Sequence, residues 1–391
     1  MKVEYHSTKF WHNIFQSQVD NPPEGVEYIV IRPFSNLSMR NKLLNRIKKN
    51  VPITIKKAIK ERIIKKTILG HPTELVWGTS KSDVDLIHSQ GVLLRTDKPY
   101  VLEVENATAF VGGSWRGLLF EKKDELKDAL LRENCRKILP WTNASLNSIA
   151  YIVDNDPRIL AKCEVLYPAI QLPYTSQRIL EMRDSVIRNK FHVLFIGNLF
   201  YAKGGLKVLT ACEKLSEEYP LKLTMISHFP EKIYKKYRNK KFINLIKFDP
   251  QINGNFLEQK YLEADLFVMP TSRDTFGRVF LEAMSYGLPV IGSTCRPVPE
   301  IVGEAMCLPI NTEFHDENDI PKYSDWDYIN ERGVFIEEVK RENKEASNDL
   351  AEMIKKNMKY QIEQRAFVEE RFLYKFRNNQ LLNIYKQALE G

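Results

Sequence analysis

The stretch that decides the fold is residues 270–292, PTSRDTFGRVFLEAMSYGLPVIG. The apolar run at 264–269 predicts a buried strand that ends at a proline, and the short polar segment 271–277 predicts a loop. The apolar spacing over 278–286 predicts a packed helix, and 288–292 begins a second strand. Such a βαβ unit places its loop and helix start at the carboxyl edge of a parallel sheet, where ligands bind. Because helix-start amides and the helix dipole attract negative charge, we expect an anion such as a diphosphate there.

Two acids frame this unit, Asp274 in the loop and Glu282 in the helix. Glu282 stands four residues after Arg278, so an ordinary ion pair along the helix is one interpretation. The surrounding helix is largely apolar, and a carboxylate there needs partners, of which sugar hydroxyls are a good kind. Asp274 fits a turn or helix-start residue as well as a ligand-binding one, and the local sequence leaves both interpretations open.

The same stretch resembles the signature of the retaining glycosyltransferases of family 4, which have the GT-B fold. The shared positions are Pro270-Thr271, Asp274, Phe276-Gly277, Leu281-Glu282-Ala283-Met284 and Gly287-Leu288-Pro289-Val290. The resemblance implies that Glu282 holds the ribose hydroxyls of a nucleotide-sugar donor. It also implies that Asp274, where the family normally has Glu, lies beside the transferred sugar. Phe276 and the amides of Gly277 and Arg278 are then expected at the donor.

A second strand–loop–helix unit opens the same domain. A buried strand is predicted at 191–197, and a helix is predicted after the loop 198–205. Lys203 in this loop is either an exposed lysine or a phosphate ligand. The loop resembles the Gly-Arg-Leu and Lys-Gly of family 4, which implies that Gly197 and Lys203 contact the donor diphosphate. Asn198 replaces the family's arginine, and either Arg273 or Arg278 is a candidate for supplying the missing charge.

Further candidates follow from the same resemblance. Glu300 stands in a Pro-Glu-Ile-Val segment typical of the family, and it either touches the donor sugar or caps the following turn. Glu105 and Asn106 follow a predicted strand at 100–104, where the family often has a histidine near the transferred sugar. They are candidates for binding the acceptor or the sugar, although Glu105 also fits an ordinary strand-end acid. We expect His88 to be a packed strand residue.

Composition and length limit the number of domains, the cellular compartment and the kinds of site that the sequence allows. The 391 residues, 43% of them hydrophobic and 28% charged, predict two ordinary globular domains. The first residues lack the apolar core of a signal peptide, and no apolar run approaches the roughly 18 residues of a membrane span. The five cysteines are scattered without a Cys-x-x-Cys pair, so we expect a reducing cytoplasm, no disulfide framework and no structural zinc. Asp83-Val84-Asp85 has the form of a metal-binding motif but precedes its strand, and we expect no metal.

The net charge of +8 is unevenly placed along the chain. Residues 40–66 contain eleven Lys or Arg and a single Glu, with leucine and isoleucine recurring among them. This basic amphipathic pattern fits an anionic membrane surface, and it also fits solvated helices packed on the first domain. Nucleic acid is the less favoured partner because the run has no aromatic residues for base stacking.

The resulting prediction is an α/β protein of the GT-B fold, with two Rossmann-like domains and a C-terminal helix that crosses back. The apolar run 163–170 predicts a strand that ends in a proline-marked bend, beyond which the chain leaves the first domain. The acceptor domain is expected at 1–172, completed by about 370–391, and the donor domain at 173–369. The expected reaction transfers a sugar from a UDP- or GDP-sugar to an acceptor hydroxyl, without a further cofactor, in cell-surface glycan or glycolipid synthesis. The resemblance to family 4 implies that the transfer retains the anomeric configuration. The acceptor is expected to be a glycan or a lipid-linked molecule at the inner membrane face. The alternatives are a non-catalytic relative that binds sugar nucleotides and a basic nucleic-acid-binding protein.

Overall fold

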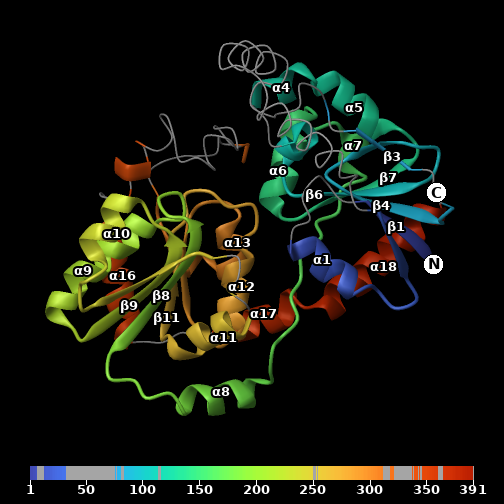
Figure 1. Ribbon diagram of the computed structural model, residues 1–391. Helices are drawn as coiled ribbons and strands as arrows, with labels where there is room; N and C mark the ends of the chain where they lie inside the picture. Colours follow the sequence, from blue (N-terminus) through green and yellow to red (C-terminus); the bar gives the residue numbers. More distant parts are fainter. Residues whose placement is uncertain are drawn as a thin grey trace, which may run out of the picture.

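The computed structural model describes most of the chain. The described residues are 1–6, 13–31, 75, 77–80, 83–112, 116–249, 252, 254–310, 318–320, 337, 339–341, 343, 346–359 and 364–390. The basic run at 40–66 lies outside them. In the parts that are described, two separate parallel sheets form two domains, with the C-terminal helix returning to the first (Figure 1).

The first domain is built on a parallel sheet in which the described strands follow the order β2-β1-β4-β6-β7. The successive elements are β1 (Lys2–His6), α1 (Asn13–Asp20), β2 (Glu27–Ile31), β4 (Leu86–Gln90), β6 (Tyr100–Val104), η2 (Ala107–Val111), α4 (Arg116–Glu121), α5 (Lys123–Leu131), β7 (Cys135–Pro140), α6 (Asn143–Ile152) and α7 (Pro157–Leu160). A small parallel pair, β3 (Trp77–Thr79) and β5 (Leu93–Arg95), accompanies them. The strands β4 and β6 are buried along their whole length, as expected for a sheet covered on both faces.

The second domain has the strand order β10-β9-β8-β11-β12-β13 among its described residues, which is the order of a doubly wound Rossmann sheet. The elements are α8 (Ser176–Asp184), β8 (Phe191–Leu199), α9 (Gly205–Glu218), β9 (Leu221–His228), α10 (Glu231–Tyr237), β10 (Ile243–Lys247), α11 (Gly254–Glu263), β11 (Leu266–Val268), α12 (Arg278–Ser285), β12 (Val290–Ser293), α13 (Val298–Val302), η3 (Glu304–Met306), β13 (Cys307–Leu308), α16 (Ser347–Lys359) and α17 (Arg365–Arg371). The βαβ unit predicted at 264–292 is therefore present as β11, α12 and β12.

The last helix, α18 (Tyr374–Glu390), lies against the sheet of the first domain, so both ends of the chain are in that domain (Figure 1). Leu381, Ile384 and Tyr385 of this helix join the apolar side chains of β1, β4 and β7 in one buried cluster. The chain thus passes between the domains twice. The two passages touch where Ile170 N donates to Phe372 O at 2.8 Å. The predicted GT-B architecture, with a C-terminal helix that returns, is confirmed.

One predicted strand is wrong. The apolar run 163–170 was expected to form a strand, but the structure shows only isolated bridges at Cys163 and Ile170. The segment runs beside β7, where the amides of Glu164 and Leu166 each bond to a β7 carbonyl, and it then reaches Pro168. Because proline has no N–H to donate, the ladder ends there and the chain turns toward the second domain.

Candidate functional site

The candidate site lies where β8 and β11 pair at the centre of the second sheet. In the order β10-β9-β8-β11-β12-β13, the connections leave in opposite directions at this point. In open α/β sheets, ligands bind at such a point, beside the loops that follow the carboxyl ends of the strands. The loop after β8 carries Lys203, and the loop after β11 carries Asp274. Both loops were predicted from the sequence, and the strand order brings them together.

Lys203 and Asp274 form an ion pair between these two loops. The Lys203 ammonium lies 2.8 Å from Asp274 Oδ2 and also donates to the Arg273 carbonyl at 3.2 Å. The two side chains are 14% and 12% exposed, so the alternative that Lys203 is an exposed loop lysine is wrong. The pair places one cation and one carboxylate together at the edge where a ligand is expected.

Glycines make this close approach of the loops possible. Gly204 has φ of +79°, and a Cβ there would lie 2.3 Å from the carbonyl oxygen of Pro270. Gly197 faces the stem of Lys203, because its added Cβ would lie 2.8 Å from Lys203 Cβ. Larger residues at these two positions would push Lys203 away from the loop that holds Asp274.

Asp274 also shapes its own loop. Its Oδ1 accepts from the amides of Thr275 at 2.9 Å and Phe276 at 3.3 Å. These bonds form a turn just before α12, which begins after Gly277 with φ of +80°. The turn interpretation of Asp274 is therefore confirmed, while Oδ2 faces Lys203. The two interpretations of this acid are compatible because they use different oxygens.

Glu282 lies on α12 one turn inside the helix. Arg278 Nε lies 3.1 Å from Glu282 Oε1, which is the ion pair along the helix that the spacing predicted. The Tyr261 hydroxyl of α11 donates to Oε2 at 3.2 Å. Burial raises the pKa of Glu282 above its ordinary value, although Arg278 and Tyr261 act in the opposite direction. The side chain as a whole is 35% exposed.

The remaining candidates of the second domain have different surroundings. Asn198 is exposed at the end of β8, and Gly197 before it is buried. Arg273 is only 5% exposed, and Arg278 pairs with Glu282. Phe276 is buried, with its ring centroid 6.3 Å from that of Trp141 in the first domain.

Glu300 contacts the first domain through four hydrogen bonds. Its Oε1 accepts from Ala144 N at 2.9 Å. Its Oε2 accepts from Asn143 N at 2.9 Å, Asn143 Nδ2 at 3.0 Å and the Tyr167 hydroxyl at 3.0 Å. The carboxylate therefore lies at the amino end of α6, across the boundary between the domains.

The candidates of the first domain lie just after β6. Asn106 is the N-cap of η2, and its Oδ1 accepts from Thr108 N at 2.8 Å. Glu105 is half-buried beside it. Asp85 of the Asp-x-Asp motif accepts from Lys2 N at 2.8 Å, and Asp83 is exposed near Lys98. Among the described residues, no three His, Cys, Asp or Glu side chains form a group that could hold a metal ion.

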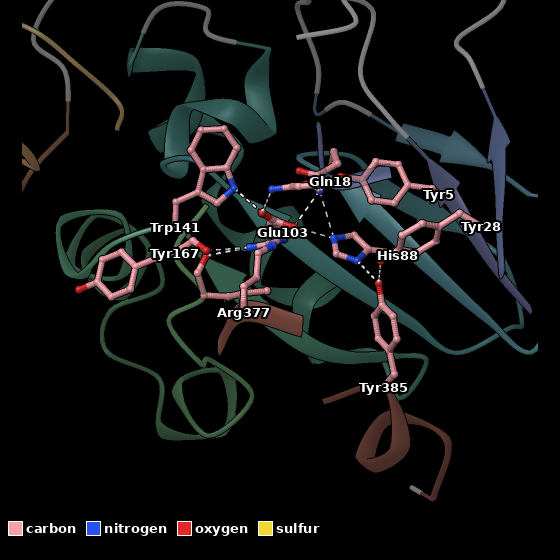
Figure 2. Close-up of polar contacts among 11 residues, drawn as sticks. Tyr5, Gln18, Tyr28, His88, Glu103, Trp141, Tyr167, Arg377 and Tyr385 are labelled. Carbon is pink, nitrogen blue, oxygen red and sulfur yellow. Dashed lines mark hydrogen bonds and ion pairs between the residues drawn. The ribbon is translucent and has the colours of Figure 1, made fainter. Parts of the chain in front are cut away.

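The sequence did not predict a buried polar network centred on Glu103 of β6 (Figure 2). Its Oε1 accepts from Trp141 Nε1 at 2.6 Å and Gln18 Nε2 at 3.2 Å. Its Oε2 accepts from Arg377 Nη2 at 2.7 Å and Gln90 Nε2 at 2.8 Å, and lies 2.7 Å from His88 Nε2. The only sequence signal for it was one acid within a strand of apolar residues.

The protonation of this network follows from its partners. Burial alone would raise the pKa of Glu103, but Arg377 and the hydrogen bonds from His88 and Gln90 outweigh burial and lower it to about 2. Burial lowers the pKa of His88, despite the opposing effect of Glu103. His88 is thus neutral, and since ionised Glu103 can only accept, Nε2 carries the proton. Nδ1 then accepts from the Tyr385 hydroxyl at 2.6 Å. The expectation that His88 is a packed strand residue is confirmed.

Fold and site together define a two-domain GT-B protein. Residues 178–317 match the family model described as Glycosyl transferases group 1. The match covers about a third of the chain and lies in the second domain, where it includes the loops of Lys203 and Asp274. In the described part of the chain, no helix is long and apolar enough to cross a membrane.

Curated relatives match only parts of the chain. The sulfoquinovosyl transferase SQD2 of Arabidopsis thaliana is 44% identical over 57 residues, which are 15% of this chain and 11% of that protein. An uncharacterized glycosyltransferase of Methanocaldococcus jannaschii is 32% identical over 116 residues, 28% of this chain and 29% of the relative. The matched region therefore spans less than a third of either relative.

Solved structures match the whole chain at the level of the fold. A glycosyltransferase from Rickettsia africae has a TM-score of 0.57 and 14% identity, with 100% of this chain and 98% of that one covered. The lipopolysaccharide outer core galactosyltransferase WaaB has a TM-score of 0.53 and 13% identity, with 98% and 99% covered. At these identities, the likeness shows the shared fold.

Proposed function

We propose that this protein is a glycosyltransferase that moves a sugar from a nucleotide-sugar donor to an acceptor hydroxyl with retention of configuration. The observation that carries the proposal is the Lys203–Asp274 ion pair at the centre of the second sheet, immediately before α12. The group 1 match over 178–317 includes all of this region. Sugar nucleotides combine a diphosphate with hydroxyl-rich sugars, and the two loops together with α12 offer a cation and two carboxylates for them.

In this proposal, Lys203 and the amino end of α12 stabilise the negative charge that develops on the leaving diphosphate. Asp274, Oδ2 of which already accepts from Lys203, lies beside the transferred sugar. Glu282 accepts hydrogen bonds from the ribose hydroxyls, with Tyr261 and Arg278 fixing its carboxylate. Gly197, Asn198, Phe276 and Gly277 form the walls of the donor site. A metal ion has no role in this scheme.

The first domain is proposed to bind the acceptor, with the domain boundaries near 172 and 370. Glu105 and Asn106 are the candidate contacts, because they follow β6 at the edge of the sheet. Contact between the domains excludes water, so that the acceptor hydroxyl and not water receives the sugar. We further propose a cytoplasmic protein that acts in cell-surface glycan or glycolipid synthesis, with the 40–66 run at the inner membrane face.

The test is a transfer assay with a panel of UDP- and GDP-sugars, supplied with glycan and lipid-linked acceptors. The proposal predicts release of nucleoside diphosphate from one donor, together with a product of the donor's anomeric configuration in its NMR spectrum. Binding of a sugar nucleotide without turnover would instead favour the non-catalytic relative, for which Asn198 and Asp274 are the departures from the family pattern. A product of inverted configuration would contradict the retaining mechanism.

A further inference from the structure

The amino end of α6 in the first domain binds a carboxylate of the second domain. Thr142 is its N-cap, and the Thr142 hydroxyl oxygen accepts from Ser145 N at 3.0 Å. The amides of Asn143 and Ala144 are the next donors of the helix, and both donate to Glu300 of the second domain. A carboxylate at the start of a helix is favoured both by its hydrogen bonds and by the helix dipole.

The Glu300 side chain extends from α13 of the second domain to the amino end of α6 in the first domain. Both carboxylate oxygens are engaged by the first domain, through two backbone amides, one side-chain amide and the Tyr167 hydroxyl. Charge-assisted bonds of this kind are stronger than bonds between neutral groups. The acid that the sequence placed at the donor sugar or at a local turn therefore bonds to the first domain.

Two further contacts occur beside the same helix. One turn along α6, Asn147 Nδ2 donates to Asp319 Oδ2 at 3.2 Å, and Asp319 Oδ1 also pairs with Arg296 at 2.7 Å. The Trp141 ring, just before α6, meets the Phe276 ring edge-on. Phe276 follows the Asp274 turn in the donor loop, so the start of α6 contacts the candidate site as well as α13.

We propose that Glu300 is a positioning residue that docks the second domain onto the amino end of α6, and that it holds the domains together before any donor binds. Its role in the reaction rests on the proposed function, because the docked arrangement places the acceptor domain beside the donor loop. The docking itself needs no ligand. Glu300 acts through α6 and touches no reacting atom.

Two matched variants test the two sides of this contact. Glu300→Gln keeps the shape of the side chain but replaces one acceptor oxygen with an NH₂ group, which would face helix amides that also donate. Asn143→Pro removes the backbone N–H and the side-chain amide of Asn143, which are two of the four donors. Asn143 is the first helical residue, where proline is well tolerated. Thr142 is already extended, with φ of −150° and ψ of 168°, as a residue before proline must be.

The measurement is the distance distribution between spin labels on the exposed Asp128 of α5 and Glu217 of α9, recorded without nucleotide. Cys163, the half-buried thiol, is replaced by serine in every variant, because the other cysteines are buried. We expect a narrow distribution in the parent. Each variant is expected to shift the ratio of closed to open molecules about tenfold, a change of about 1.4 kcal/mol. Glu304→Gln, an exposed acid four residues further on, is the control and should leave the distribution unchanged.

The double variant Glu300→Gln with Asn143→Pro decides whether the two residues act through one contact. If they do, it shifts the ratio no further than either single variant. Unchanged distributions in both single variants overturn the proposal, and so does a shift in Glu300→Gln alone. Because no donor is present, these outcomes are independent of whether the parent binds a sugar nucleotide.

Once transfer is measured, Glu300→Gln should lower kcat about tenfold, while the Kd of a nucleoside diphosphate should stay within about twofold. A loss of nucleotide affinity would instead place Glu300 at the donor.

Discussion

Replacing Glu103 with glutamine should destabilise the first domain strongly, because five donors converge on its carboxylate. Those donors are Gln18, Gln90, His88, Trp141 and Arg377. A glutamine side chain keeps one acceptor oxygen and turns an NH₂ group toward donors. It also leaves the Arg377 guanidinium, only 4% exposed, without its counter-charge.

The expected magnitude follows from the burial of this pair. Removing one partner of a buried ion pair costs about 3–5 kcal/mol. Since a folded domain is stable by only about 5–15 kcal/mol, the variant should lose a large part of the stability of its first domain. Replacing both partners, as Glu103→Gln with Arg377→Met, should cost less than the single change, because no charge is then left buried and unpaired.

The assay is urea unfolding followed by tryptophan fluorescence. Four of the five tryptophans precede residue 142, so the signal reports mainly on the first domain. The exposed Glu133→Gln serves as a control and should change the free energy of unfolding by no more than about 0.5 kcal/mol. If Glu103→Gln matches that control, or if the double variant is less stable than the single one, the ion pair of Glu103 and Arg377 does not stabilise the first domain.

Three other predictions follow from the same contacts. Acid should lower the free energy of unfolding of the first domain in two steps. The first step begins below pH 6.5, the ordinary pKa of histidine, because buried His88 stays neutral in the folded state. The second runs from pH 4.5, the ordinary pKa of glutamate, toward the folded-state pKa of Glu103, which is about 2. Urea unfolding at successive pH values checks this, and the lower step should be absent in Glu103→Gln. Lys203→Ala should lower kcat about 10²–10³-fold, as for loss of one group that stabilises developing charge, whereas Lys240→Ala on the surface should not; equal activity of parent and Lys203→Ala would mean that the diphosphate is held elsewhere. The 40–66 run should make the protein sediment with anionic but not zwitterionic vesicles at low salt, and this binding should fall when Lys48, Lys49, Lys56 and Lys57 are changed together to glutamine. If the parent protein does not sediment with anionic vesicles, the acceptor is expected to be a soluble molecule.

The sequence predicted the helices, strands and loops whose formation depends on residues close together in the chain. The βαβ unit at 264–292 follows from local apolar spacing, a loop and two breakers, all within one short stretch. The loops that carry Lys203 and Asp274 were likewise found by their position after buried strands. Their ion pair follows only once β8 and β11 are known to be neighbours.

Contacts between distant segments could not be predicted in this way. Glu103 and Arg377 are 274 residues apart, and the sequence near either residue does not indicate that they are in contact. Glu300 was expected near the donor or at a local turn, and its bonds to Asn143 and Ala144 depend on how the two domains meet. The strand expected at 163–170 failed because an apolar run shows that a segment is buried without showing where its amides find partners.

In the proposed function, a nucleotide binds beside the loops of Lys203 and Asp274 at the carboxyl edge of the second sheet. The most direct measurement is the thermal unfolding of the parent and of Glu282→Gln with UDP, GDP and their sugars. At a hundred times its Kd, the right nucleotide should stabilise the parent by about 2.7 kcal/mol. Glu282→Gln should bind more weakly by about 1.5–3 kcal/mol, the value of a hydrogen bond to a charged group. No stabilisation by any of these nucleotides would mean that the second domain binds none of them, and equal stabilisation of the parent and the folded variant would mean that Glu282 does not hold the ribose.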